Sequence, residues 1–342
     1  MPRDLRLGTR GSQLALWQAH AVADRIRSAG GPSCEIVVIR TTGDRLQEAP
    51  LSEAGGKRLF VKEIEEALGR GDIDVAVHSS KDMPVVLPDG LSIGAVLPRE
   101  DPFDAVVLPL RADGSGLMAA LSPQISAIRS VDDLVARLGQ QPAIGTSSVR
   151  RVAQLTRVFP NARFQPIRGN LDTRLRKLDA AEYDAIVLAA AGLRRLGFAR
   201  RISMSLPAEI SVPAPGQGIV AIEIRADDRH VRSIVERIND AHAGAALDAE
   251  RAVVEALGGG CQTPIGALAT PVAADDRDDA LELDVVAVVV AIDGSRAVRA
   301  RARGPLEDAR QLGAEVGAQL IADGATEILA EARPELRAPN HA

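Results

Sequence analysis

Predicted strands and helices alternate along the first third of this 342-residue chain, and this alternation constrains its fold more than any other feature. Such alternation indicates a mostly parallel sheet with helices on its faces, an α/β fold. Ser12 is placed to cap the first helix, and Gly71 to end a second helix over 61–71. The expected strands are 5–10, 35–40 and 72–79.

The alternation weakens between residues 109 and 142, where only a helix opened by Ser130 is expected, and then resumes as a second α/β unit. Its expected elements are a strand ending at 143–145, a helix over 147–159, a strand over 162–169, a helix over 170–180 and a strand over 183–192. Residues 213–220, rich in Pro and Gly, predict a crossing or hinge segment. Two units joined in this way predict two lobes and a ligand cleft between them.

A third region follows the crossing segment. Its expected elements are helices over 228–241 and 246–257, a glycine-rich loop, a strand over 281–292 and a helix over 306–322. A chain of 36.0 kDa has the length of two or three domains.

Composition excludes several classes of function. The net charge of -5 and the 2% aromatic content argue against a nucleic-acid binder. Two cysteines, Cys34 and Cys261, are too few for a disulfide scaffold, and Cys34 is most simply a packing residue. The five histidines lack ligand spacing, so we expect no metal, and no nucleotide-binding motif occurs. We see neither a secretory signal nor a membrane-spanning run, and expect a cytoplasmic protein with no membrane partner.

The first candidate site is the segment HSSKDMP, residues 78–84, at the C-terminal end of a predicted strand. A carboxylate at Asp82 could stabilise a cation or exchange a proton, and Lys81 beside it would favour the ionised form. The alternative is a plain turn closed by Pro84, since turns need the same residue types.

The second candidate is GTSSVRR, residues 145–151, where Thr146, Ser147 and Ser148 open a helix after a glycine turn. A helix N-terminus favours anions, although simple N-capping would select the same residues. Arg150 and Arg151 are adjacent, so their side chains should point in different directions, and we expect at most one to face the cleft.

The same strand, glycine turn and helix recur at residues 167–180, with Arg168 and Arg174 beside the turn. Arg10 and Arg195 follow two further strands. This repetition favours a polyanionic ligand, because arginine binds carboxylates through strong, directional bonds.

The segment GGGCQTPIG, residues 258–266, leaves Cys261 on a glycine-flanked turn after a helix. The helix C-terminus disfavours a thiolate, and no histidine stands near enough in sequence to serve as its base. The paired glycines of residues 53–63 would suit a lid, or an ordinary surface loop.

Together these motifs resemble the porphobilinogen deaminase (hydroxymethylbilane synthase) family over almost the entire chain. The matching segments, in order, are LGTRGSQLALWQA, GGKRLFVKEIE, DIDVAVHSSKDMP, REDPFDA, IGTSSVRR, RGNLDTRL, YDAIVLAAAGLRRLG, PAPGQG and GGGCQTPIG. Each segment alone is modest, but their order and spacing make the resemblance specific.

The resemblance implies a monomer of three domains: 1–102 with 218–237, then 103–217, then a smaller α+β domain over 238–342. The first two are similar to type II periplasmic binding proteins, with a cleft between them. A dipyrromethane cofactor is implied on Cys261 through a thioether. The implied reaction adds four porphobilinogen units head to tail with loss of ammonia, and hydrolysis then releases linear hydroxymethylbilane for tetrapyrrole synthesis.

The resemblance also assigns roles to residues. Asp82 matches the essential carboxylate, which would stabilise the azafulvene cation formed from the substrate. The positions that match cofactor contacts are Ser79, Lys81, Thr146, Ser147, Ser148, Arg150, Arg151, Arg168 and Gly169. The positions that match substrate contacts, or lie near the active site or its hinge, are Arg10, Ser12, Gln18, Phe60, Arg174, Arg195 and Gln217.

Two departures from the family pattern stand out. The stretch over residues 110–141 is longer than the matching stretch in the family, and we expect the extra residues to form a surface elaboration. Ser80 occupies a position that varies in the family.

The residues leave two other functions open. One is a non-catalytic two-lobed anion-binding protein, for which the third region has no role, and the other is a cysteine-dependent acyl or phosphoryl transferase, for which Cys261 lacks a base.

Overall fold

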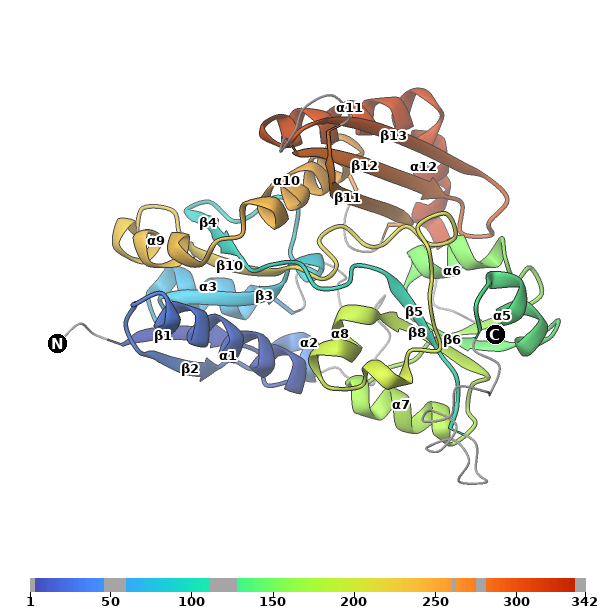
Figure 1. Ribbon diagram of the computed structural model, residues 1–342, viewed down its shortest axis with the longest axis horizontal. Coiled ribbons are helices and arrows are strands. Elements are labelled where there is room, and N and C mark those ends of the chain that lie inside the picture. The colour runs from blue at the N-terminus through green and yellow to red at the C-terminus, as the bar shows by residue number, and fades with distance from the viewer. Residues whose placement is uncertain (1–3, 46–59, 111–127, 260–262, 275–280, 336–342) are drawn as a thin grey trace.

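The computed structural model describes residues 4–45, 60–110, 128–259, 263–274 and 281–335. These residues form three sheets, two of five strands and one of three strands. Figure 1 shows the first lobe at the left, the second at the right, and the third domain above both. The expected α/β fold of three domains is confirmed, whereas the exact domain boundaries stay a prediction.

The first lobe is built on a sheet with strand order β2-β1-β3-β10-β4. Strands β1, β2 and β3 are parallel, and β10 runs antiparallel to both of its neighbours. Leu7, Val22 and Val77 are almost fully buried between the sheet and the helix that Ser12 caps. The elements are β1 (Leu5–Thr9), α1 (Gln13–Ser28), β2 (Cys34–Val38), α2 (Thr42–Arg45), α3 (Lys62–Arg70), β3 (Val75–Ser79), η1 (Ser80–Asp82), β4 (Leu91–Val96), β10 (Val220–Arg225), α9 (Arg229–Val235) and η3 (Glu236–Ile238).

The second lobe repeats this topology, with strand order β7-β6-β8-β5-β9. Here β6, β7 and β8 are parallel, and β5 is the antiparallel strand. The expected helix after Ser130 is present and closed by a capping box with Asp133. The elements are β5 (Asp104–Val107), α5 (Val131–Leu138), β6 (Ala143–Gly145), α6 (Val149–Thr156), β7 (Arg163–Gln165), α7 (Leu171–Asp179), β8 (Ala185–Ala189), α8 (Ala190–Arg195), η2 (Ala199–Arg201) and β9 (Met204–Ser205).

The chain crosses between the lobes twice. In each lobe, the antiparallel strand is the first strand that follows a crossing from the other lobe. One crossing joins β4 to β5, and the second joins β9 to β10 through the Pro- and Gly-rich segment, as expected. The crossings touch at Gly218, whose φ is +89° and where a Cβ would stand 2.2 Å from the Glu100 carbonyl oxygen. Only glycine fits this contact.

The third domain packs one face of the sheet β11-β12-β13 against helices. Its elements are α10 (Ala241–Ala256), β11 (Ile265–Ala273), β12 (Leu281–Val290), β13 (Ala297–Pro305), η4 (Leu306–Asp308), α11 (Ala309–Ala322) and α12 (Ala325–Glu335). The fully buried Glu250 ties this domain to both crossings. Its carboxylate accepts hydrogen bonds from Arg99 Nη1 at 2.5 Å and from the Gly216 backbone N–H at 2.6 Å.

The predicted boundary between the two helices after the second crossing is wrong. The first helix ends at Val235 and gives way to η3, and the second begins at Ala241 and not at 246. Asp240 caps the second helix, since its side chain accepts a hydrogen bond from Ala243 N. A run of alanines hid this start, because alanine contributes little to the helical pattern of apolar residues.

Candidate functional site

The segment HSSKDMP turns sharply at the end of β3, beside the second crossing. Ser80 N donates to the Ile219 carbonyl at 3.0 Å, and the buried Met83 fixes the far end of the turn. The Asp82 side chain is exposed. A carboxylate is therefore presented on a turn that is held at both ends.

Lys81 lies between the two lobes. Its Nζ donates to Gln217 Oε1 at 3.2 Å, and Gln217 Nε2 in turn donates to Asp104 Oδ1 at 2.9 Å. Burial, with a smaller contribution from the positive charge of Arg151, lowers the pKa of Lys81 to about 8, although Asp82 opposes the shift. The charges of Asp82 and Asp104 therefore offset the cost of burying the Lys81 ammonium only in part.

Asp104, at the start of β5, binds both adjacent arginines of α6. Its carboxylate accepts from Arg150 Nη1 at 2.7 Å and from Arg151 Nη2 at 2.8 Å, and Ser211 donates to it at 2.8 Å. Burial alone would raise the pKa of Asp104, but the two guanidiniums outweigh it and lower that pKa well below its ordinary value. The sequence motif REDPFDA contains this residue, but its role was missed.

The expectation that Arg150 and Arg151 point in different directions is wrong. Both side chains are buried and donate hydrogen bonds to the same carboxylate, that of Asp104 at the start of β5. Arg150 also donates to the Val212 carbonyl, and Arg151 to that of Val187. Most of their donors are therefore engaged within the protein.

The three hydroxyl residues before α6 are engaged in local bonds. Ser148 caps the helix by accepting from Arg151 N. Ser147 Oγ donates to the Ile167 carbonyl at 2.9 Å and so ties this turn to the next one. Thr146 is buried and its Oγ1 accepts from Ser148 N.

Arg168 and Arg174 stand at the second glycine turn and differ from the buried pair. Within the described residues, Arg168 donates no hydrogen bond, and Arg174 uses only Nε, toward the Gly169 carbonyl at 2.8 Å. Burial, then the charges of Arg151 and Arg168, lower the pKa of Arg174 to about 10, whereas Asp82 opposes the shift. Arg174 therefore lies within electrostatic range of Asp82 as well as of Arg151 and Arg168.

Arg10 lies on the first lobe, with partners of its own. Its Nη2 is 2.5 Å from Asp44 Oδ1, and its guanidinium stacks 4.2 Å from the ring centroid of Phe60. On the same lobe, Gln18 Nε2 donates to Ser79 Oγ at 2.9 Å. Ser12 serves as the N-cap of α1. The proposed lid residues 53–59 lie outside the described residues.

Arg195, at the end of α8, links the lobes at their junction. It donates to the Gly218 carbonyl at 2.7 Å, and its guanidinium lies 5.4 Å from the ring centroid of Trp17 on α1. Burial lowers the pKa of Arg195 to about 10, partly opposed by Glu100.

A small cavity of about 80 Å³ opens where the crossing, the HSSKDMP turn and the third domain meet. It is lined by Ser80, Lys81, Met83, Val85, Ser148, Arg150, Ala214, Pro215, Leu247, Arg251, Val254, Thr263 and Ile265. Cys261 lies outside the described residues, two positions before Thr263 in sequence.

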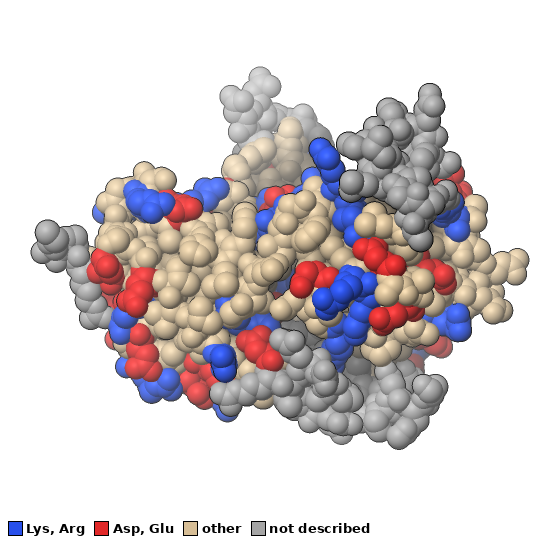
Figure 2. All heavy atoms as spheres, turned by 90° about the horizontal axis from the view of Figure 1, so that it is seen from below, with Lys and Arg blue, Asp and Glu red and all other residues tan. Residues whose placement is uncertain are grey.

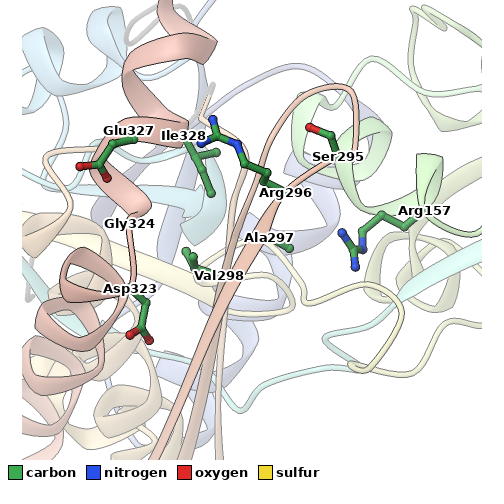
Figure 3. A pocket seen from close by; sticks show the side chains of 9 residues that line it. All are labelled: Arg157, Ser295, Arg296, Ala297, Val298, Asp323, Gly324, Glu327 and Ile328. Carbon is green, nitrogen blue, oxygen red and sulfur yellow. The ribbon is translucent and has the colours of Figure 1, made fainter.

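A larger hollow of about 470 Å³ contains none of the predicted site residues. Figure 3 shows Arg157 on one side of the Ser295–Arg296 turn, with Asp323 and Glu327 across from it. On the face seen in Figure 2, acidic and basic side chains lie near one another. Arg201, for example, forms an ion pair with Asp179 at 2.7 Å. The guanidinium of Arg168, in contrast, donates no hydrogen bond within the described residues.

Comparison with known proteins decides the family. Residues 5–233 match the model "Porphobilinogen deaminase, dipyromethane cofactor binding domain", and residues 245–322 match "Porphobilinogen deaminase, C-terminal domain". The chain belongs to the porphobilinogen deaminase family. It is 44% identical to porphobilinogen deaminase of Geobacter metallireducens, over 96% of this chain and 95% of that protein. It is 45% identical to that of Bordetella parapertussis, over 98% of both.

The two porphobilinogen deaminase models meet near the boundary between the lobes and the third domain. Its first part spans both lobes, and its second covers most of the third domain. Among solved structures, the chain is also similar to an ancestral cationic amino acid solute binding protein, with a TM-score of 0.40 and 14% identity over 72% of this chain and 93% of that one. Every helix within the described residues is too short or too polar to cross a lipid bilayer.

The polar side chains that line the 80 Å³ cavity fit the dipyrromethane cofactor that the porphobilinogen deaminase family implies. Such a group carries several carboxylates on an apolar pyrrole frame. The 80 Å³ cavity offers three cations and three hydroxyls among apolar side chains, and its lining includes no carboxylate. One lining hydroxyl, that of Ser80, is buried without a partner in the described structure.

Proposed function

We propose that this protein is a hydroxymethylbilane synthase. It joins four porphobilinogen molecules head to tail, with one ammonia lost at each addition, and releases linear hydroxymethylbilane by hydrolysis. The observation that carries the proposal is the exposed carboxylate of Asp82, whose charge acts on Arg174, together with the guanidinium of Arg168, which donates no hydrogen bond within the described residues. That the enzyme is a cytoplasmic monomer belongs to the same proposal and rests on the family resemblance.

Dipyrromethane, bound through Cys261, would supply the free pyrrole carbon to which the first substrate unit is joined. Lys81, Arg150, Arg151 and the hydroxyls of Ser79, Thr146, Ser147 and Ser148 would hold its side chains. Because Arg150 and Arg151 already bind Asp104, they would act chiefly through their charge and their remaining donors.

Asp82 acts on the substrate. Loss of ammonia from porphobilinogen leaves a cationic carbon conjugated to the pyrrole nitrogen, so the pyrrole N–H becomes more acidic. A carboxylate fixed at the end of β3 accepts that N–H and stabilises the developing charge. The same carboxylate would take up the proton released when the new carbon–carbon bond forms.

The open arginines bind the substrate's acetate and propionate groups. Arg168 and Arg174 are each held near the turn at Gly169 and keep donors available for a carboxylate. Arg10, Ser12, Gln18, Phe60, Arg195 and Gln217 would complete the substrate side of the site. A charge-assisted hydrogen bond contributes about 1.5–3 kcal/mol, and loss of one should be measurable in the kinetics.

Intact mass measurement tests the proposal. Protein purified from cells that make porphobilinogen should carry the mass of two added pyrrole units, and Cys261→Ser should lack it. Asp82→Ala should keep the fold and lose most turnover. A wild-type mass equal to the bare chain would contradict the proposal and would favour the two-lobed anion-binding alternative.

A further inference from the structure

Ser80 has a buried hydroxyl that the fold itself does not use. The residue is 3% exposed, and its Oγ has no hydrogen-bond partner in the described structure. Its backbone, in contrast, is fully engaged, with N donating to Ile219 and the carbonyl accepting from Met83 N at 3.1 Å. A buried hydroxyl without a partner is unfavourable, so such an atom points to a ligand.

Ser80 is one of the residues that line the 80 Å³ cavity. Beside it stands Gly216, with φ at +73°, where a Cβ would be only 2.5 Å from Ser80 Oγ. Glycine at this position therefore leaves the space that the hydroxyl needs. A cavity needs only about 10–15 Å³ of this kind of space to hold one water molecule, so the 80 Å³ cavity has room for the carboxylate arm of a ligand.

The charges around the cavity select an anion. Lys81, Arg150 and Arg251 line it, and its lining contains no acidic side chain. Lys81 donates to a neutral amide, Gln217, and Arg251 donates to the Val85 carbonyl. Asp104 neutralises Arg150, whereas the cavity lining supplies no carboxylate to Lys81.

We propose that Ser80 donates a hydrogen bond to a pyrrole side-chain carboxylate of the bound cofactor, which enters this cavity beside Lys81. The proposal rests on the proposed function, because that function supplies the ligand. It adds Ser80 to the site as a positioning residue. The lowered pKa of Lys81 supports it, since an anion in the cavity would restore the ammonium.

The experiment compares Ser80→Ala with a matched serine. Ser203 is the control, because its Oγ already accepts from Leu108 N at 3.1 Å on the second lobe. Apoprotein of each variant, made in cells unable to synthesise porphobilinogen, is mixed with porphobilinogen. Intact mass gives the rate of cofactor assembly, and thermal melts are recorded before and after loading.

For Ser80→Ala we expect an apoprotein that melts at or above the wild-type temperature, because no internal bond is lost. Its assembly should be about ten-fold slower, equivalent to about 1.4 kcal/mol, and loading should raise its melting temperature less. Ser203→Ala should melt lower in both forms and assemble at the wild-type rate.

Two outcomes would overturn the inference while leaving the proposed function intact. One is a Ser80→Ala protein that assembles at the wild-type rate with the wild-type gain on loading, as a water-filled cavity would give. The other is an equal loss of melting temperature in both forms, which would make the hydroxyl structural. If wild-type apoprotein gains no mass, the proposed function itself fails.

Discussion

Two turns of the second lobe share one design and differ in what their arginines do. Each has a strand, a glycine turn and a helix with arginine nearby. At the first turn, Arg150 and Arg151 are buried on Asp104, whereas at the second Arg168 and Arg174 meet no carboxylate in the described structure. An arginine-rich turn can therefore serve the fold as well as a ligand, and the guanidiniums that meet no carboxylate within the described residues are those of the second turn.

The largest effect should come from removing the shared carboxylate of the first turn. Asp104→Ala leaves two buried guanidiniums without their partner, and we expect the free energy of unfolding to fall by about 3–5 kcal/mol. Urea denaturation of the apoprotein measures this loss. The control is Asp172→Ala, an exposed carboxylate at the start of α7. A loss no greater than that of the control would mean that Asp104 does not hold the pair.

The second turn should respond in the opposite way. Arg168→Met should leave the stability nearly unchanged and lower turnover by about 10- to 100-fold, as loss of one charge-assisted bond implies. The control is Arg176→Met, an exposed arginine on α7. Chemical denaturation and steady-state kinetics separate the two effects. If Arg168→Met unfolds as easily as Asp104→Ala, the two turns do not differ as described.

The pKa of Lys81 gives a third prediction, because burial and the nearby charge of Arg151 both lower it. Its pKa is about 8 in the fold and about 10.4 in an unfolded chain. Below pH 8 both states hold the proton, and the folded state bears the full cost of burying it. Between these values the unfolded state binds more protons, so the stability contribution rises with pH.

Apoprotein stability, measured from pH 7.5 to 10, should therefore rise for wild type relative to Lys81→Met. Loading with the cofactor should raise the Lys81 pKa and take up as much as one proton per molecule near pH 8.5, which calorimetry in two buffers would measure. Parallel pH profiles for the two proteins would contradict this expectation.

The smallest effect should come from the contact between lobes at Arg195. Trp17→Leu removes the stacking of that guanidinium and should cost about 0.5–1 kcal/mol. The Arg195 bond to the Gly218 carbonyl stays. Thermal melts of the apoprotein would show the shift, and Val86→Ala, at an exposed apolar residue, is the control. A shift as large as that of Asp104→Ala would assign the lobe contact a far greater role.

The helices, strands and motifs could be predicted from the sequence because each depends on residues that are close together in the chain. The glycine turns, the cap at Ser12 and the crossing segment each depend on neighbouring residues. The role of Asp104 could not be found in this way, because it is 46 positions from Arg150 and meets it only through the pairing of β5 with β8. Ser80 was noticed as a departure, but its missing partner is a property of the packed structure.

The attachment of Glu250 has a mechanical consequence. Its carboxylate joins the third domain to Arg99 on one crossing and to Gly216 on the other, close to the point where the two crossings touch. Points near a pivot travel least when the arms of a lever swing. If the lobes rotated about the crossings, their outer ends would move furthest, and the part of the third domain that carries Glu250 would move least.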